Sequence, residues 1–182
     1  MKITVIGRGN VGGGLAERWR RSGHEVTELG QDGGDATDAD VLLVAVPSAA
    51  IAEALGRVSG SNGKTTIDAT NAFRDRDESF ESNAHQVKSI VGGPTAKSFN
   101  LNLANVYDRI DAEPTPPGNL YAADDDAREV TEQLIRDAGY EFVYAGDLTQ
   151  ARPLEEHLAL MFSISQARLG PFFYRIAKPV AS

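Results

Sequence analysis

Short apolar runs alternate along this chain with segments whose apolar residues recur at helical spacing. In the first half we expect strands over residues 2–7, 24–29, 41–47 and 64–71, and helices over 10–22 and 48–58. In the second half we expect helices over 78–90, 102–110, 126–138 and 148–169, and strands over 94–99, 119–123 and 141–146. This alternation is typical of an α/β protein with a doubly wound, mostly parallel sheet.

The composition narrows the classes of function. The chain has 26 acidic and 18 basic side chains, a formal net charge of -8 and a pI near 4.9. Such a chain does not resemble a nucleic-acid binder, because affinity for the phosphate backbone comes from clustered Lys and Arg. Without cysteine there are no disulfides or thiolate ligands, and three histidines are few for a metal enzyme. We therefore expect neither a nucleic-acid partner nor a metal.

The hydropathy pattern also bears on location. The longest apolar run, at residues 41–47, is far shorter than the roughly 20 residues that span a bilayer. The N-terminal residues enter the first expected strand without a long apolar leader segment. We expect no membrane association and a cytoplasmic location.

A glycine-rich turn follows the first expected strand. The sequence VIGRGNVGGG places Gly7, Gly9 and Gly12 in G-x-G-x-x-G spacing at the start of a helix. In dinucleotide-binding folds these glycines allow a tight turn, close approach of a pyrophosphate and close packing of helix on strand. The alternative is a turn kept only for packing, whereas a P-loop is excluded because no Gly-Lys-Ser/Thr follows. Two further glycines, Gly13 and Gly14, indicate close contact with a ligand or with the sheet.

The segment after the second expected strand is unusually short. Only the eleven residues Gly30 to Asp40 separate it from the strand at 41–47, too few for a further helix and edge strand. Eleven extended residues reach about 36 Å, whereas a direct jump across two strands needs roughly 20 Å. We therefore expect a sheet shortened after its second strand, with the crevice at the carboxyl ends of the strands preserved.

The same segment lacks a residue that would select the cofactor. An acid that binds the adenosine ribose is expected near Gly30 and an NADP-type arginine near Gln31, and neither is present. Glu28 and Asp32 are nearby carboxylates, of which Asp32 could repel a 2′-phosphate, while Gln31 could donate to either form. The choice between NAD and NADP stays open from the residues alone. Arg8 either reaches a phosphate from the turn or lies solvated.

Several segments together resemble the NADP-dependent deazaflavin (coenzyme F-420) reductase family and its short dinucleotide-binding relatives. The likeness covers nearly the whole chain, in order, and rests on ITVIGRGNVGGG, ADVLLVAVP, TTIDATN, AKSFN and ARPLEE. It implies a Rossmann-like fold, an NADP or NAD cofactor, and a small C-terminal part that helps to build the pocket of a second substrate and often a dimer. It also implies hydride transfer between the nicotinamide and a deazaflavin or flavin ring, so that positioning matters more than an acid or base.

The resemblance carries over specific positions. The expected cofactor-binding residues are Gly7, Arg8, Gly9, Asn10, Val11 and Gly12 in the pyrophosphate loop, with Gln31, Pro47, Ser48, Asn71, Lys97 and Asn100. No catalytic residue is named. The alternatives are a solvated strand residue for Lys97 and a helix cap for Asn100. Arg152 and Glu155 match the motif that opens the final helix, or form an ordinary ion pair at i, i+3.

These observations predict a single NAD(P)-binding domain over residues 1–182. Residues 1–100 form the dinucleotide-binding core, and 101–182 form a C-terminal extension that ends in helix and completes the sheet and the substrate pocket. We expect an NAD(P)-dependent oxidoreductase that acts as a homodimer on a small redox substrate. The alternative is a non-catalytic dinucleotide-binding redox sensor or subunit. It is based on the absence, at Gly30 and Gln31, of a residue that would bind the ribose or its 2′-phosphate.

Overall fold

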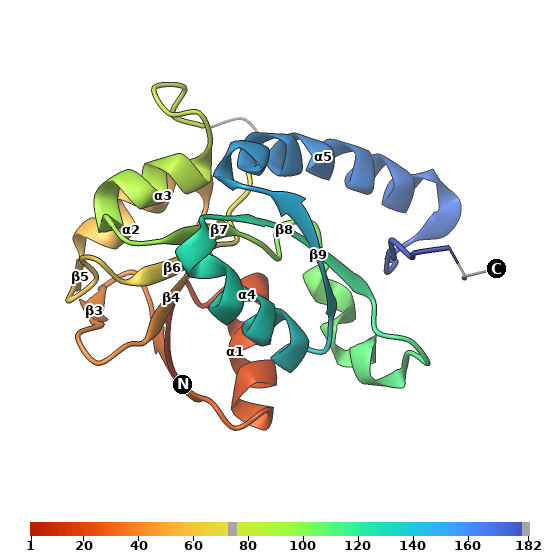
Figure 1. The fold of residues 1–182 in the computed structure, drawn as a ribbon, viewed down its shortest axis with the longest axis horizontal. Coiled ribbons are helices and arrows are strands. Elements are labelled where there is room, and N and C mark those ends of the chain that lie inside the picture. The colour runs from red at the N-terminus through yellow and green to blue at the C-terminus, as the bar shows by residue number, and fades with distance from the viewer. Residues whose placement is uncertain (73–75, 180–182) are drawn as a thin grey trace.

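A computed structural model describes residues 1–72 and 76–179 and has one main sheet of seven strands (Figure 1). The strand order is β2-β1-β4-β6-β7-β8-β9. The strands are β1 (Lys2–Ile6), β2 (Glu25–Leu29), β4 (Val41–Val44), β6 (Thr65–Asp68), β7 (Thr95–Lys97), β8 (Gly118–Ala123) and β9 (Glu141–Gly146). All neighbouring pairs are parallel except β7 and β8, which are antiparallel. The expected mostly parallel α/β fold is confirmed.

Helices cover both faces of this sheet. The α-helices are α1 (Asn10–Arg21), α2 (Ile51–Gly56), α3 (Asn83–Val91), α4 (Asp125–Asp137) and α5 (Ala151–Ile164). The 3-10 helices are η1 (Ser48–Ala50), η2 (Ala104–Ala112) and η3 (Leu148–Gln150), and the π-helix η4 (Ser165–Leu169) follows α5. In Figure 1, α1 and α4 lie together in the lower centre of the view, α2 and α3 lie together at the left, and α5 runs along the top.

The central strands are apolar on both faces because both are covered. Val41 and Leu43 of β4 pack with Trp19 of α1 in one hydrophobic cluster. Leu42 and Val44, which alternate with them, pack with α2 and α3 in a second cluster. Successive side chains of a strand point to opposite faces, so a continuous apolar run is what a buried parallel strand requires.

The short segment after β2 contains a strand that the sequence did not reveal. Gly34 and Asp35 form β3, which pairs in parallel with the two residues of β5 (Val58–Ser59). Gly33 has a φ of 73°, and a Cβ there would lie 2.1 Å from the backbone oxygen of Arg57. The shortening is therefore real, but the segment is tied to the end of α2 by a two-residue ladder instead of jumping freely to β4.

Several expected elements differ in extent; the helix expected at 78–90, for example, is α3 and begins at Asn83. The expected helix at 48–58 is η1 followed by α2, and its last expected residue is already in β5. The expected helix at 102–110 is the 3-10 helix η2. The expected helix at 148–169 is divided into η3, α5 and η4, and Arg168 in η4 has a φ of 85°.

No helix within residues 1–72 and 76–179 is both long enough and apolar enough to cross a membrane.

Candidate functional site

The glycine-rich turn joins β1 to α1, and two of its glycines are required by close packing. Gly7 has a φ of 110°, and a Cβ there would lie 2.3 Å from the backbone oxygen of Ala45 at the end of β4. A Cβ on Gly12 would lie 2.0 Å from the backbone oxygen of Gly7. Neither position can hold a larger residue without a backbone shift. These two glycines allow the tight turn and the close approach of α1 to the strand.

Gly9 is a glycine for a different reason. It is the N-cap of α1 in an extended conformation, with a φ of -77°, and no described atom other than those of its chain neighbours lies within 4 Å of the place where its Cβ would be. Gly9 has no side chain to cap the helix, and the first turn that follows is uncharged. The amide groups at a helix start carry partial positive charge and bind anions. The turn therefore has the open space and the donors that a pyrophosphate needs.

Of the two additional glycines, Gly14 is required by packing within the protein. A Cβ on Gly14 would lie 2.5 Å from Cδ2 of Tyr107 in η2, while a Cβ on Gly13 would make only ordinary contacts at 3.7 Å. The interpretation of Gly14 as a contact with ligand or sheet is therefore wrong. Its small size lets Tyr107 pack against α1 in the main hydrophobic cluster.

A cavity of about 910 Å³ opens beside this turn, at the carboxyl ends of β1 and β4. Its lining residues are Ile6, Gly7, Arg8, Gly9, Gly30, Gln31, Asp32, Ala45, Val46, Pro47, Ala50, Glu53, Ala54 and Arg57. Five of the expected cofactor-binding residues are among them: Gly7, Arg8, Gly9, Gln31 and Pro47. Its size is in the range of small-molecule and cofactor sites. The position agrees with the rule that open α/β sheets hold ligands beyond the carboxyl ends of their strands.

The cavity wall formed by η1, α2 and the residue after α2 was not predicted. Ala50, Glu53, Ala54 and Arg57 line it, and Arg57 Nη1 donates a hydrogen bond to the backbone oxygen of Gln31 at 2.7 Å. These residues belong to no motif recognised in the sequence. Their helical spacing would indicate one face, but only the fold shows that this face meets the segment after β2.

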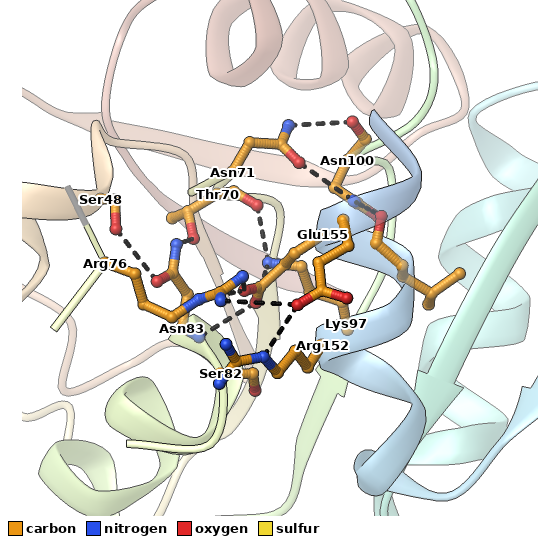
Figure 2. Close-up of polar contacts among 12 residues, drawn as sticks. Ser48, Thr70, Asn71, Arg76, Ser82, Asn83, Lys97, Asn100, Arg152 and Glu155 are labelled. Atoms are coloured by element: carbon orange, nitrogen blue, oxygen red, sulfur yellow. Dashed lines mark hydrogen bonds and ion pairs between the residues drawn. The ribbon is translucent and has the colours of Figure 1, made fainter. Parts of the chain in front are cut away.

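The remaining expected residues lie outside this lining. They are Asn10, Val11, Gly12, Ser48, Asn71, Lys97 and Asn100. Asn10, Val11 and Gly12 form the first turn of α1, while the others lie at the ends of β4, β6 and β7, where the structure joins them through a polar network (Figure 2).

A cluster of four charged side chains lies at the centre of that network. Lys97, Asp68 and Glu155 have side chains with no exposed surface, and the side chain of Arg76 is 9% exposed. Lys97 Nζ lies 2.7 Å from Asp68 Oδ2 and 3.0 Å from Glu155 Oε1, and it also donates to the backbone oxygen of Thr70 at 2.6 Å. Arg76 Nη2 lies 2.9 Å from Glu155 Oε2. Two cations and two anions thus compensate one another in the interior.

We call these four residues, Asp68, Arg76, Lys97 and Glu155, the buried charge cluster. It corrects the alternative of a solvated strand residue for Lys97, because the ammonium group is fully enclosed. The cluster joins β6 and β7 to α5, which supplies Glu155. An unpaired buried charge is costly, so each member depends on its partners.

A chain of hydrogen bonds runs from the cluster to the turn after β4. Glu155 Oε1 accepts from the backbone N–H of Asn83 at 3.0 Å. The side chain of Asn83 donates to Thr70 Oγ1 at 2.9 Å and accepts from Ser48 Oγ at 3.0 Å. Ser48, next to Pro47 of the cavity wall, is 7% exposed. The position of Ser48 is therefore set by α3 and, through α3, by α5 (Figure 2).

Asn71 and Asn100 bind each other. The Asn100 amide donates to Asn71 Oδ1 at 3.0 Å and to the backbone oxygen of Leu154 at 3.0 Å, and the Asn71 amide donates to the Asn100 backbone oxygen at 2.9 Å. Asn100 therefore links the segment after β7 to α5 by a hydrogen bond, and it is not the helix cap considered above. Its Oδ1 is buried without a hydrogen-bond partner among the described residues. Asn71 is half-buried beside it.

Arg152 and Glu155 do not pair with each other. Arg152 Nε lies 2.9 Å from Glu156 Oε1 and its Nη2 lies 3.4 Å from Glu78 Oε2, all three on the surface. Glu155, the residue before Glu156 in α5, faces the interior. The i, i+3 ion pair is thus wrong, because one side of the helix is solvated and the other is buried.

The aromatic residues after η4 pack on their own chain. Phe172 and Tyr174 pack against the cluster that contains Leu154 and Leu158 of α5. The Tyr174 hydroxyl oxygen accepts from the backbone N–H of Leu120 in β8 at 3.0 Å. Burial raises the pKa of Tyr174 from 10.0 to about 12.

Residues 1–72 and 76–179 contain no group of three or more His, Cys, Asp or Glu side chains arranged to hold a metal ion.

No family model and no curated protein sequence matches the chain. Solved structures do match. A candidate coenzyme F-420-dependent NADP reductase from Arthrobacter sp. FB24 superposes with a TM-score of 0.82 and 22% identity, over 98% of this chain and 100% of that one. The fold is Rossmann-like.

Two further solved structures support the same fold. A hypothetical protein from Sinorhizobium meliloti has a TM-score of 0.68 and 25% identity, over 84% of this chain and 88% of that one. A reductive aminase from Aspergillus terreus, in complex with NADPH and ethyl levulinate, has a TM-score of 0.66 and 18% identity. The match covers 91% of this chain but only 61% of the aminase. The resemblance stated from the sequence is thus confirmed in its fold.

Proposed function

We propose that this chain is an NADP(H)-dependent oxidoreductase that transfers hydride to or from a small redox partner. The observation that carries the proposal is the glycine-rich turn, in which Gly9 leaves open space at the start of α1 beside a cavity of about 910 Å³. This is the arrangement in which Rossmann-like folds hold a pyrophosphate. The solved structures described as NADP- or NADPH-dependent reductases support the same cofactor.

Each part of the site has a distinct role in this proposal. The turn from Gly7 to Gly12 holds the pyrophosphate, and Gln31 lies at the adenosine end of the cavity. Pro47 and Ser48 hold the nicotinamide half at the carboxyl end of β4, with Ser48 fixed by Asn83. Asn71 and Asn100 lie near the second substrate, while Lys97 supports this region from the interior. The bound nicotinamide supplies the hydride, so the protein contributes binding, orientation and exclusion of water.

A deazaflavin or flavin is our preferred class of second substrate. The support is the likeness over the full length of the candidate coenzyme F-420-dependent NADP reductase. Imines are less favoured, since this chain spans only 61% of the reductive aminase. We also propose a homodimer, because Leu160 on α5, Leu169 and Ile176 are 52%, 61% and 56% exposed on the C-terminal part.

Two measurements test the proposed function. Titration with NADPH and NADH, followed by the fluorescence of the reduced nicotinamide, should give a dissociation constant well below millimolar for at least one of them. Oxidation of the bound cofactor is then followed with a deazaflavin, FMN and a cyclic imine as separate acceptors. Absence of binding to both dinucleotides would refute the proposal. Binding without hydride transfer to any acceptor would favour the redox sensor or subunit instead.

A further inference from the structure

Gly30 follows β2, where dinucleotide-binding folds place the residue that reads the ribose 2′ position. Its φ lies outside the left-handed region, so the backbone does not require glycine there. A Cβ on residue 30 would lie 2.1 Å from Nη2, 2.7 Å from Cζ and 2.8 Å from Nε of Arg8. The guanidinium group of Arg8 therefore fills the space that a side chain at residue 30 would take.

Arg8 brings an uncompensated positive charge to this place. It lines the cavity and is exposed to solvent. Within residues 1–72 and 76–179 it forms no hydrogen bond or ion pair with another side chain or with the backbone. A guanidinium group stays protonated at physiological pH and presents a planar fork of donors that matches a phosphate group.

The second arginine of the lining is already engaged. Arg57 Nη2 lies 2.6 Å from Glu53 Oε1, and Arg57 Nη1 donates to the backbone oxygen of Gln31. Arg57 thus fixes the segment after β2 while its charge is balanced by Glu53. A phosphate that enters here meets Arg8 as the cation whose charge is not balanced by a described neighbour.

Of the two nearby carboxylates, one is engaged in an ion pair and the other is exposed in the cavity. Glu28 in β2 pairs with Arg20 of α1 at 2.7 Å and is not part of the cavity lining. Asp32 does line the cavity and is exposed. Asp32 is therefore the rival reader, which would accept hydrogen bonds from the ribose hydroxyls of NAD(H) and repel a 2′-phosphate.

We propose that Arg8, lying over Gly30, binds the 2′-phosphate and makes the site selective for NADP(H) over NAD(H). This inference rests on the proposed function and adds to it the residue that chooses the cofactor. The cation that usually follows the second strand is supplied here from the first variable position of the glycine-rich turn. The glycine at residue 30 is the complementary change that gives the arginine its room.

Binding of cofactor fragments tests this inference without any need for activity. Calorimetric titration compares 2′-phospho-ADP-ribose with ADP-ribose, which differ only in the 2′-phosphate. We expect the wild-type protein to bind the phosphorylated fragment about tenfold to hundredfold more tightly, as one charge-assisted contact provides. In Arg8→Gln this preference should fall to within about threefold, while the affinity for ADP-ribose changes little.

Two further variants sharpen the comparison. In Gly30→Val the new side chain displaces the Arg8 guanidinium, which can swing away, so the preference should also fall in a folded protein. Arg21→Gln is the matched control, because Arg21 pairs with Glu17 on the exposed face of α1 and should keep the full preference.

The outcomes separate this inference from the proposed function. Equal binding of both fragments by the wild-type protein, or a preference that survives Arg8→Gln, would overturn the role of Arg8 and leave dinucleotide binding intact. A wild-type preference for ADP-ribose that is lost in Asp32→Asn would identify an NAD(H) reader and overturn it as well. Failure of both fragments and both dinucleotides to bind would overturn the proposed function and this inference together.

Discussion

Glu155 on α5 accepts a hydrogen bond from the backbone N–H of Asn83 at 3.0 Å, and the same carboxylate contacts both buried cations. One side chain from the last helix therefore completes the first turn of α3 and compensates the charges of Lys97 and Arg76. The contact joins the C-terminal part of the chain to the region around Ser48, to which Asn83 is bonded.

Glu155→Gln should destabilise the protein strongly. The amide keeps the shape of the side chain but leaves Lys97 and Arg76 with too little negative charge in the interior, which costs about 3–5 kcal/mol in comparable cases. The free energy of unfolding, measured in urea, gives the size of the loss. Glu156→Gln is the control, since the Glu156 side chain is 59% exposed and its loss should cost at most about 0.5 kcal/mol. Equal stability of the two variants would contradict the structural role of Glu155.

Lys97→Met tests whether Lys97 contacts the cofactor. All described contacts of its ammonium group are with protein acceptors, so we expect a loss of stability of about 3 kcal/mol or more from the uncompensated carboxylates. The dissociation constant for NADPH, measured with the protein fully folded at low temperature, should change by less than about threefold. A tenfold weaker binding at unchanged stability would instead place Lys97 in the cofactor site.

Gly9→Val and Gly12→Ala should affect different properties: the first should impair cofactor binding and the second should lower the stability of the fold. Valine at residue 9 projects into space that no described atom fills, so binding of NADPH should be lost while unfolding changes by about 1 kcal/mol or less. Alanine at residue 12 overlaps the Gly7 oxygen and should destabilise the fold by about 1–3 kcal/mol. Fluorescence titration and urea unfolding measure the two effects. Unchanged affinity in Gly9→Val would remove the pyrophosphate assignment.

The protein should lose stability at alkaline pH. Burial raises the pKa of Tyr174 to about 12, and burial with the hydrogen bond to Glu132 raises the pKa of Tyr121 to about 12 as well. Since both values exceed the 10.0 of an unfolded tyrosine, the neutral hydroxyls stabilise the fold fully below pH 10 and this stability is lost between pH 10 and 12. Urea unfolding at several pH values measures the slope. Tyr174→Phe should make it shallower, and an identical slope would argue against this explanation.

The sequence predicted those parts of the fold that local pattern determines. The apolar runs at β1, β4 and β6 and the spacing of Gly7, Gly9 and Gly12 follow from the backbone geometry of strand and turn, so one segment suffices to recognise them. The ladder of β3 and β5 could not be predicted, because two residues carry no periodicity. The antiparallel orientation of β8 relative to β7 could not be predicted either, since it depends on how the long connection between them, which includes η2, runs in space.

The buried charge cluster was missed for a related reason. Lys97 was expected to bind the cofactor or to be a solvated strand residue, and Glu155 to pair with Arg152 or to match a family motif. Burial was not expected for either, because charged side chains are seldom fully buried and their partners lie on other elements. The alternation of β7, with Ala96 between Thr95 and Lys97, gave no sign of which face is enclosed. A lysine inside an otherwise buried strand was the available signal, and it predicts burial only when a carboxylate such as Asp68 is expected on the neighbouring strand.

The buried charge cluster also limits how the chain can be divided. A fragment that ends before α5 would keep Lys97, Arg76 and Asp68 but lose both Glu155, the carboxylate that the two cations contact, and the helix that encloses them. The first hundred residues hold the glycine-rich turn and the strands beside it. We nevertheless do not expect them to fold stably on their own. In evolution or in engineering, the nucleotide half and the last helix would have to be exchanged together.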